Sequence, residues 1–222
     1  FSDDISGIDH YEYAIGTGGG SAGENYSLSF DGVDDYVVFN TDYNIPFGNS
    51  NRTIMVSVRL ESFTTDAAIV QYGVSTVGNL CAIGLSPITG KWFFWSYDND
   101  LISNGTLDIN DWVNLAVTIS NNGSSVAMYV NGILDTQANI SSINTTSSSS
   151  IYIGRSFSDS HINGNIDDVL IWDTALTQEQ IQSYLSSSPT GTESGLVGYW
   201  NFNEGEGSTL TDLSGNENHG TI

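Results

Sequence analysis

The sequence is poor in basic residues. Four Lys and Arg residues stand against 26 Asp and Glu residues, which gives a formal net charge of −22. A surface of this charge repels phosphate backbones and anionic lipid, so nucleic-acid binding and membrane insertion are not expected. It attracts divalent cations, although the same charge also fits a solvated, aggregation-resistant exterior without a specific site.

Cysteine is almost absent as well. Cys81 is the single cysteine, which excludes a disulfide framework and a cysteine zinc cluster. It lies in the apolar run NLCAIGL, so we expect a small core residue. There is no run of about eighteen apolar residues, and the chain does not open with a basic and then apolar signal segment. We therefore expect an excised or mature fragment.

What the sequence does contain is a series of short apolar segments separated by Gly, Asn, Asp and Ser. This texture predicts an all-β sandwich with one main domain. The predicted strands are NYSLSF, YVVF, TIMVSVRL, AAIVQYG, LCAIGL, KWFFWSY, WVNLAVTIS, SVAMYV, ILDT, SIYIG and DVLIW. Asn131-Gly132 predicts a tight type I′ hairpin, which needs positive φ at both residues.

One short helix is expected near the C-terminal end. Thr177 can cap it, Gln180 is the matching capping-box residue, and Pro189 follows as a stop. The apolar residues of this segment share one face, so we expect the helix to lie against the edge of the sandwich.

The two ends of the chain differ from the middle. Residues 1–22 contain a strand, His10–Ile15, followed by GGGSAG, which predicts the remnant of a preceding immunoglobulin- or fibronectin-like domain and a linker. Residues 23–190 form the main domain. Residues 191–222 return to strands and turns, and we expect them either to pack on this domain or to begin a next repeat.

Four segments together resemble one known family. SLSFDGVDDYVVF, WVNLAVTIS with VAMYVNGILD, IYIGRS and GNIDDVLIWDTALTQEQI are similar to laminin-G-like, concanavalin A-type jelly-roll domains of bacterial surface and secreted proteins. The resemblance covers about residues 24–189. It implies a two-sheet antiparallel jelly roll, a calcium ion in many members, and binding of a glycan or a cell-surface or matrix ligand without catalysis.

The adjacent acids Asp167 and Asp168 raise the question of catalysis. Successive side chains of a regular strand point to opposite faces, so these two carboxyls are not expected to address one sugar ring. A retaining glycosidase needs two carboxyls about 5 to 5.5 Å apart on one side of the bond. A polysaccharide hydrolase or lyase would need acids from distant strands, and it remains an alternative.

A metal site is the second interpretation of the acids. The loop FDGVDDY offers Asp31, Asp34 and Asp35, which are hard oxygen donors suited to calcium. The family resemblance adds Asp167 as an acid that meets this loop from another strand. The alternative is that Asp31 only bonds its own turn and that Asp34 and Asp35 are solvated.

A ligand surface is predicted at the aromatic strand KWFFWSY. Alternation places Trp95 and Tyr97 on one face, beside the acidic turn with Asp98 and Asp100, where they can form a sugar platform. Half-buried packing is the other interpretation. The polar loop RSFSDSHINGN, with Asp159 and His161, is a second candidate for recognition, whereas Trp112, Trp172 and Trp200 are expected in the core.

The sequence thus predicts a calcium-associated carbohydrate-binding or adhesion module of a secreted or cell-surface multidomain protein. A spacer repeat without a ligand is the first alternative, and the polysaccharide-active enzyme is the second.

Overall fold

The structure is a computed structural model of the chain. It describes residues 11–13, 26–39, 44–63, 66–147 and 150–222, with only the backbone of residues 11–13. The predicted linker GGGSAG and half of the predicted strand His10–Ile15 lie outside the described residues.

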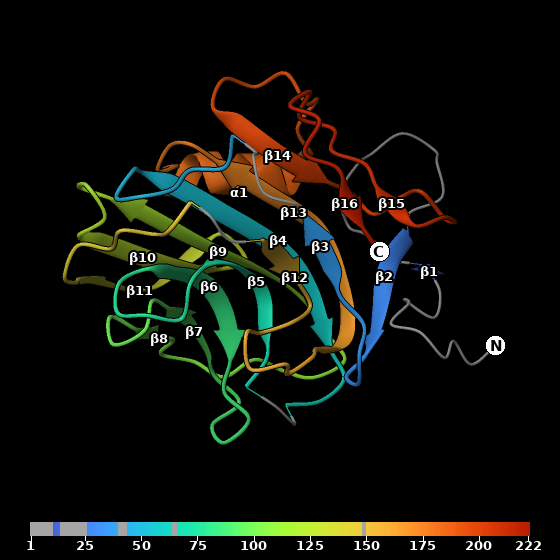
Figure 1. Cartoon of the computed structure of the whole chain (residues 1–222), viewed down its shortest axis with the longest axis horizontal. Coiled ribbons are helices and arrows are strands. Elements are labelled where there is room, and N and C mark those ends of the chain that lie inside the picture. The colour runs from blue at the N-terminus through green and yellow to red at the C-terminus, as the bar shows by residue number, and fades with distance from the viewer. Residues whose placement is uncertain (1–10, 14–25, 40–43, 64–65, 148–149) are drawn as a thin grey trace.

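Two antiparallel sheets pack face to face, which confirms the predicted sandwich (Figure 1). Sheet A has the strand order β1-β2-β13-β4-β9-β10-β11, with β14 added beside β13. Its strands are β1 (Tyr11–Tyr13), β2 (Tyr26–Asp31), β4 (Arg52–Leu60), β9 (Trp112–Ser120), β10 (Ser125–Val130), β11 (Ile133–Asn139), β13 (Asn163–Trp172) and β14 (Leu196–Trp200).

Sheet B has the order β15-β16-β3-β12-β5-β6-β7-β8. Its strands are β3 (Val37–Phe39), β5 (Ala68–Gly73), β6 (Leu80–Leu85), β7 (Trp92–Trp95), β8 (Leu101–Ile102), β12 (Ile151–Ile153), β15 (Thr209–Leu210) and β16 (Gly220–Thr221). Consecutive strands of the chain often belong to different sheets, as in a jelly roll.

The main core fills the space between the sheets. Alternate residues of each strand point inward, and Trp92 and Trp200 are fully buried there. The rings of Phe39 and Trp200 pack with centroids 4.8 Å apart. Cys81 is buried in the same cluster, as its apolar sequence context predicted. The expectation for Trp112 was wrong: at the start of β9 it points to the outer face of sheet A and is only half-buried.

The β10–β11 hairpin and the helix follow their local sequence signals. Asn131 and Gly132 both have positive φ, 50° and 73°, as the predicted tight turn requires. Helix α1 (Gln178–Ser186) has the predicted capping box, in which Thr177 and Gln180 exchange side-chain and backbone hydrogen bonds. None of the helices in the described part of the chain is long and apolar enough to span a membrane.

Helix α1 covers the outer face of sheet A and does not lie at its edge. Ile181 is buried against a second apolar cluster that includes Met55, Ala116 and Trp172 from three neighbouring strands. Sheet A therefore has apolar contacts on both faces at this end, with the main core below and the helix above (Figure 1).

Both ends of the described chain add strands to the sandwich. Strand β1, in the segment that the sequence assigned to a preceding domain, pairs with β2. At the other end β14 pairs with β13, and β16 pairs with β3 in the opposite sheet. The tail thus crosses from one sheet to the other, and Trp200 of β14 reaches the main core.

Candidate functional site

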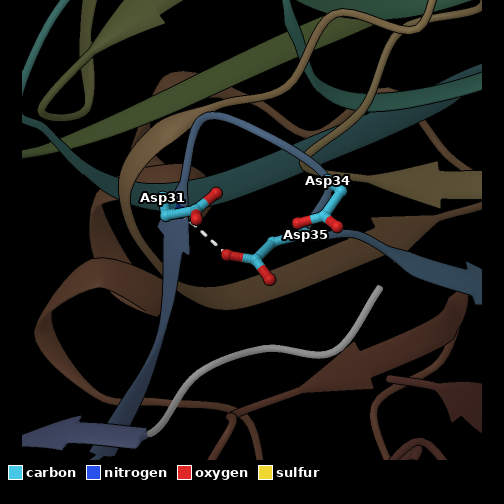
Figure 2. Close-up of side chains that lie close together, drawn as sticks. All are labelled: Asp31, Asp34 and Asp35. Carbon is cyan, nitrogen blue, oxygen red and sulfur yellow. Dashed lines mark hydrogen bonds between the residues drawn. The ribbon is translucent and has the colours of Figure 1, made fainter. Parts of the chain in front are cut away.

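Three aspartates converge in the loop between β2 and β3, called here the acidic loop (residues 31–35). Asp31, Asp34 and Asp35 each offer a carboxylate oxygen within 4.8 Å of the others (Figure 2). Asp31 Oδ1 accepts a hydrogen bond from the Val33 backbone N–H at 2.7 Å, and Gly32 has φ 84°. The turn is therefore held by its own first residue, as an Asx-type turn is.

The buried member of the acidic loop holds the other end of the turn. Asp35 is 2% exposed, and its Oδ2 accepts the Asp31 backbone N–H at 2.8 Å. Asp31 and Asp34 are exposed. Two of the carboxylate oxygens thus accept hydrogen bonds within the loop, and the carboxylates of Asp31 and Asp34 face solvent. Hard oxygen donors on a turn of this kind are the ligand type that calcium prefers.

A second loop, residues 155–161, lies beside the acidic loop and carries Asp159 and His161. Arg155 forms an ion pair with Asp159 at 2.9 Å, and its guanidinium lies over the rings of Tyr36 and Tyr152 at 4.9 and 5.3 Å. His161 Nε2 lies 3.8 Å from Asp159 Oδ1. These contacts order the loop around Arg155, one of the few basic residues of the chain.

The electrostatics of His161 show that the two loops are neighbours. Burial lowers the pKa of His161, while the carboxylates of Asp159, Asp34 and Asp31 act in the opposite direction. At neutral pH the ring is therefore neutral, and it is buried at 6% exposure. Of the two predicted ligand residues in this loop, Asp159 is the exposed one.

The structure does not bring Asp167 to the acidic loop, which corrects the ligand set suggested by the family resemblance. Asp31 pairs in register with Asn163 of β13, whereas Asp167 pairs with Ser57 of β4. Four residues along a strand correspond to about 13 Å. The β13 residue that contacts the loop is Asn163, whose Cβ lies 3.0 Å from the position that a Cβ on Gly32 would take.

Asp167 and Asp168 lie at a β-bulge, and the expectation that they face opposite sides was wrong. On β13, Asp167 pairs with Ser57 and Leu170 pairs with Met55. The two residues between them, Asp168 and Val169, therefore stand opposite the single residue Val56 of β4. Asp168 has φ 46°. Its carboxylate accepts a hydrogen bond from the Tyr199 hydroxyl at 3.4 Å, on the outer face of sheet A.

Asp167 shares this outer face. Its partner Ser57 lies between Val56 and Val58, which both point into the main core, so Ser57 and Asp167 point outward. Burial, and then the neighbouring charge of Asp168, raise the pKa of Asp167 to about 8. Burial raises the pKa of Asp168 to about 6. Asp167 is buried and Asp168 is half-buried, and the two carboxyls belong to a packed face of sheet A.

The aromatic strand β7 has the predicted alternation. Trp92 and Phe94 are fully buried in the main core, while Phe93 and Trp95 are half-buried on the outer face of sheet B. The rings of Trp95 and Tyr97 are nearly parallel, with centroids 6.3 Å apart and an interplanar angle of 12°. Tyr97 is 39% exposed, so this stack presents an apolar surface to solvent.

The turn after β7 places acids beside the stack. Tyr97 and Asp98 both have left-handed backbone, φ 57° and 72°, a conformation that is costly for residues other than glycine and is often found at functional sites. Asp100 Oδ1 accepts the Ser96 backbone N–H at 2.9 Å, which closes the turn. Burial raises the pKa of Asp100, and so does the charge of Asp98.

A row of side chains joins the two candidate regions across sheet B. Tyr152, Gln71, Ala82 and Trp95 are register partners on β12, β5, β6 and β7, and their neighbours in sequence point into the core. Three strand spacings separate Tyr152 from Trp95, about 14 Å. The 155–161 loop and the aromatic stack therefore flank one face of the sandwich.

A family comparison identifies the domain. The model for laminin-G-type domains of the concanavalin A-like lectin/glucanases superfamily matches residues 31–182, which is more than half of the chain. The chain belongs to this superfamily. The match begins at the acidic loop and ends in helix α1. No curated protein sequence matches the chain.

Solved structures with this fold include two whose descriptions mention a carbohydrate. The "putative carbohydrate binding protein" of Bacteroides ovatus ATCC 8483 has a TM-score of 0.70 at 16% identity, covering 86% of this chain and 57% of its own. Domain 4 of the arabinanase AbnA from Geobacillus stearothermophilus, in complex with arabinotriose, has a TM-score of 0.61 at 20% identity, and the match covers 80% of each chain. The SAP-like pentraxin of Limulus polyphemus has a TM-score of 0.55 at 15% identity, and the match covers 73% of this chain and 82% of the pentraxin.

These identities show the fold and not the ligand. The chain spans 57% of the Bacteroides ovatus protein, so the activity of a longer parent chain does not follow from this match. The family match shows a concanavalin A-like sandwich. The candidate binding residues come from the geometry described above.

Sequence reasoning missed two features of the site. Gln71 is fully buried on the outer face of sheet B, and neither atom of its amide has a hydrogen-bond partner among the described residues. The signal was a lone amide within the apolar run AAIVQYG. Trp112 was assigned to the core, and its position at the very start of a strand, after the polar turn LDIND, was the available sign of its outward orientation.

Proposed function

We propose that this chain is a non-catalytic, calcium-associated carbohydrate-binding module of a secreted or cell-surface multidomain protein. The observation that carries the proposal is the stack of the half-buried Trp95 on the exposed Tyr97, beside Asp98 and Asp100. The apolar face of a sugar ring packs on an aromatic ring, and carboxylates at the rim accept hydrogen bonds from its hydroxyls. Glycan-binding neighbours of the same fold support this choice of ligand.

The left-handed backbone at Tyr97 and Asp98 supports a ligand role over a packing role. Residues other than glycine hold this conformation at a free-energy cost of about 1–3 kcal/mol. A turn with only a connecting role could use glycine at both positions without this cost. The positions instead carry an exposed ring and an exposed carboxylate, which are the groups that a sugar would contact.

The acidic loop fits a calcium ion. Asp31, Asp34 and Asp35 supply converging hard oxygens, and calcium accepts six to eight of these in irregular geometry, with backbone carbonyls and water completing the set. Bound there, the ion would neutralise three adjacent carboxylates. It would also hold the β2–β3 turn against the 155–161 loop, which borders the same face of sheet B as the aromatic stack.

A glycan array tests the ligand. The wild-type protein is applied in calcium to neutral, acidic and amine-bearing oligosaccharides, together with Trp95→Ala and the control Ile88→Ala, whose side chain is 92% exposed. The proposal expects selective binding by the wild type and by Ile88→Ala, and its loss in Trp95→Ala. Absence of binding to every glycan, or equal binding by Trp95→Ala, contradicts it and favours a spacer repeat.

A further inference from the structure

A cavity lies beside strands β9 and β10 of sheet A, whereas the aromatic stack lies on sheet B. It has a volume of about 370 Å³ and lies between the 106–111 segment and the β10–β11 turn. Its lining includes Trp112, Asp108, Asp111, Asn131 and Thr106. Ligand sites typically occupy about 300–1,000 Å³, so this cavity has room for a small ligand such as one or two sugar rings.

The walls of the cavity are held by backbone hydrogen bonds. Leu107 N donates to Gly90 O at 2.9 Å, and Asn110 N donates to Leu60 O at 2.7 Å, which anchors the 106–111 segment at two points. Asn131 N donates to Asn114 O at 2.8 Å, and Asn131 Oδ1 accepts Asn114 N at 2.9 Å. The Asn131 amide is thereby fixed with its NH₂ group as the remaining donor.

One aromatic residue and two acidic residues line the cavity. Trp112 is half-buried, whereas Asp108 and Asp111 are exposed. Among the described residues, none forms an ion pair or hydrogen bond with either carboxylate. None of the residues that line the cavity is basic. Arg59 of β4 is the register partner of Trp112. Its guanidinium donates a hydrogen bond to Asn165 Oδ1 at 2.7 Å.

These groups favour a cation over a neutral ligand. A carboxylate only accepts hydrogen bonds and gains most from a charged donor. The face of an indole attracts ammonium groups, and the net charge of −22 raises the local concentration of cations around the whole molecule. The Asn131 NH₂ and the Thr106 hydroxyl can donate to ring hydroxyl oxygens, which a simple amine lacks.

We infer that this cavity binds a protonated amino sugar, with the sugar ring over Trp112 and its ammonium group between Asp108 and Asp111. The choice of a sugar as the carrier of the amine rests on the proposed function, while the cationic character rests on the cavity alone. The site is distinct from the Trp95–Tyr97 stack, since Trp112 lies on sheet A and the stack on sheet B. The module would therefore be bivalent.

Isothermal titration calorimetry at about pH 6, where primary amines are protonated, tests the inference. The probes are a glucosamine trisaccharide, its fully N-acetylated form and cellotriose. We expect the glucosamine trisaccharide to bind at least about tenfold more tightly than the other two, and to weaken as salt is added. The double variant Asp108→Asn/Asp111→Asn should lose about tenfold in affinity, as should Trp112→Ala.

Two controls separate this site from general charge and from the other site. Asp66→Asn/Glu206→Gln removes two exposed carboxylates elsewhere and should bind the glucosamine trisaccharide as the wild type does. Tyr97→Gly should also retain this binding, even if the glycan array finds no ligand for the stack. Equal binding of all three trisaccharides, no binding of any, or an equal loss in the Asp66/Glu206 control overturns the inference. Near-ultraviolet circular dichroism verifies that each variant is folded.

Discussion

The backbone N–H of Asp168 donates a hydrogen bond to Oδ1 of Asp167 at 2.8 Å. This contact exists because the β-bulge turns Asp168 into left-handed backbone and brings its N–H toward the preceding side chain. The carboxyls of the buried Asp167 and the half-buried Asp168 thus lie side by side on the outer face of sheet A, and desolvation raises the pKa of both. The pair makes stability depend on pH.

The first prediction concerns that dependence. The folded pKa of Asp167, about 8, exceeds its ordinary value of 3.8, so its contribution to stability is fully present below about pH 4 and is lost as pH rises toward 8. Asp167→Asn keeps an acceptor for the Asp168 N–H and carries no charge. We expect it to be more stable than the wild type at pH 8 by a few kcal/mol, with the gain shrinking at pH 5.

Urea unfolding at both pH values measures this difference. Asp66→Asn, at an exposed position, serves as the control and should leave the pH dependence unchanged. A gain for Asp167→Asn that is the same at pH 5 and pH 8 would show that the carboxyl is ionised in the folded protein throughout this range, contrary to the prediction.

Calcium should stabilise the folded chain through the acidic loop. An ion that binds only the folded state raises the unfolding free energy by mass action, by about 2.7 kcal/mol at a hundredfold excess over its dissociation constant. We expect calcium to raise the melting temperature and a chelator to reverse the effect, while sodium at equal ionic strength has none. Asp34→Asn should abolish the shift, because Asp34 is an exposed member of the cluster.

The control for the calcium experiment is again Asp66→Asn, at an exposed position. Asp135 is less suitable, because its carboxylate accepts a hydrogen bond from the Asn104 backbone N–H at 2.8 Å. If Asp34→Asn responds to calcium as strongly as the wild type, the acidic loop is not the site of binding.

The tail should contribute to the stability of the sandwich. Trp200 is fully buried, and its Nε1 donates to the Asn218 carbonyl at 2.9 Å. Large-to-small changes at buried aromatic positions lower the unfolding free energy by about 3–5 kcal/mol. We expect Trp200→Ala to fall in this range in chemical unfolding. A loss of less than about 1 kcal/mol would mean that the tail detaches readily from the two sheets.

The fold was largely readable from the sequence because its signals are local. The Asn131-Gly132 turn and the Thr177–Gln180 capping box each depend on residues at most three positions apart, and both occur as predicted. The short apolar segments with turn residues between them predicted a sandwich. The location of helix α1 on the face of sheet A was not readable, because it depends on contacts with Met55 and Ala116 far away in the chain.

The site was only partly readable. The convergence of Asp31, Asp34 and Asp35 follows from their shared turn, and the outward orientation of the half-buried Trp95 follows from strand alternation. The bulge at Asp168 could not be predicted, since one inserted residue changes which face every later side chain occupies. The error over Asp167 has a different cause: Asp31 pairs with Asn163, four residues before Asp167, and which residues of two distant strands pair is not a local signal of the sequence.

The central claim is that the Trp95–Tyr97 stack binds a sugar, and titration of the glycan selected by the array measures it most directly. Tyr97→Gly removes the ring while glycine accepts the left-handed backbone, and Tyr97→Phe keeps the ring. The account predicts an affinity about tenfold lower for Tyr97→Gly, equivalent to roughly 1.4 kcal/mol, and little change for Tyr97→Phe. Equal affinities for the wild type, Tyr97→Gly and Trp95→Ala would contradict it.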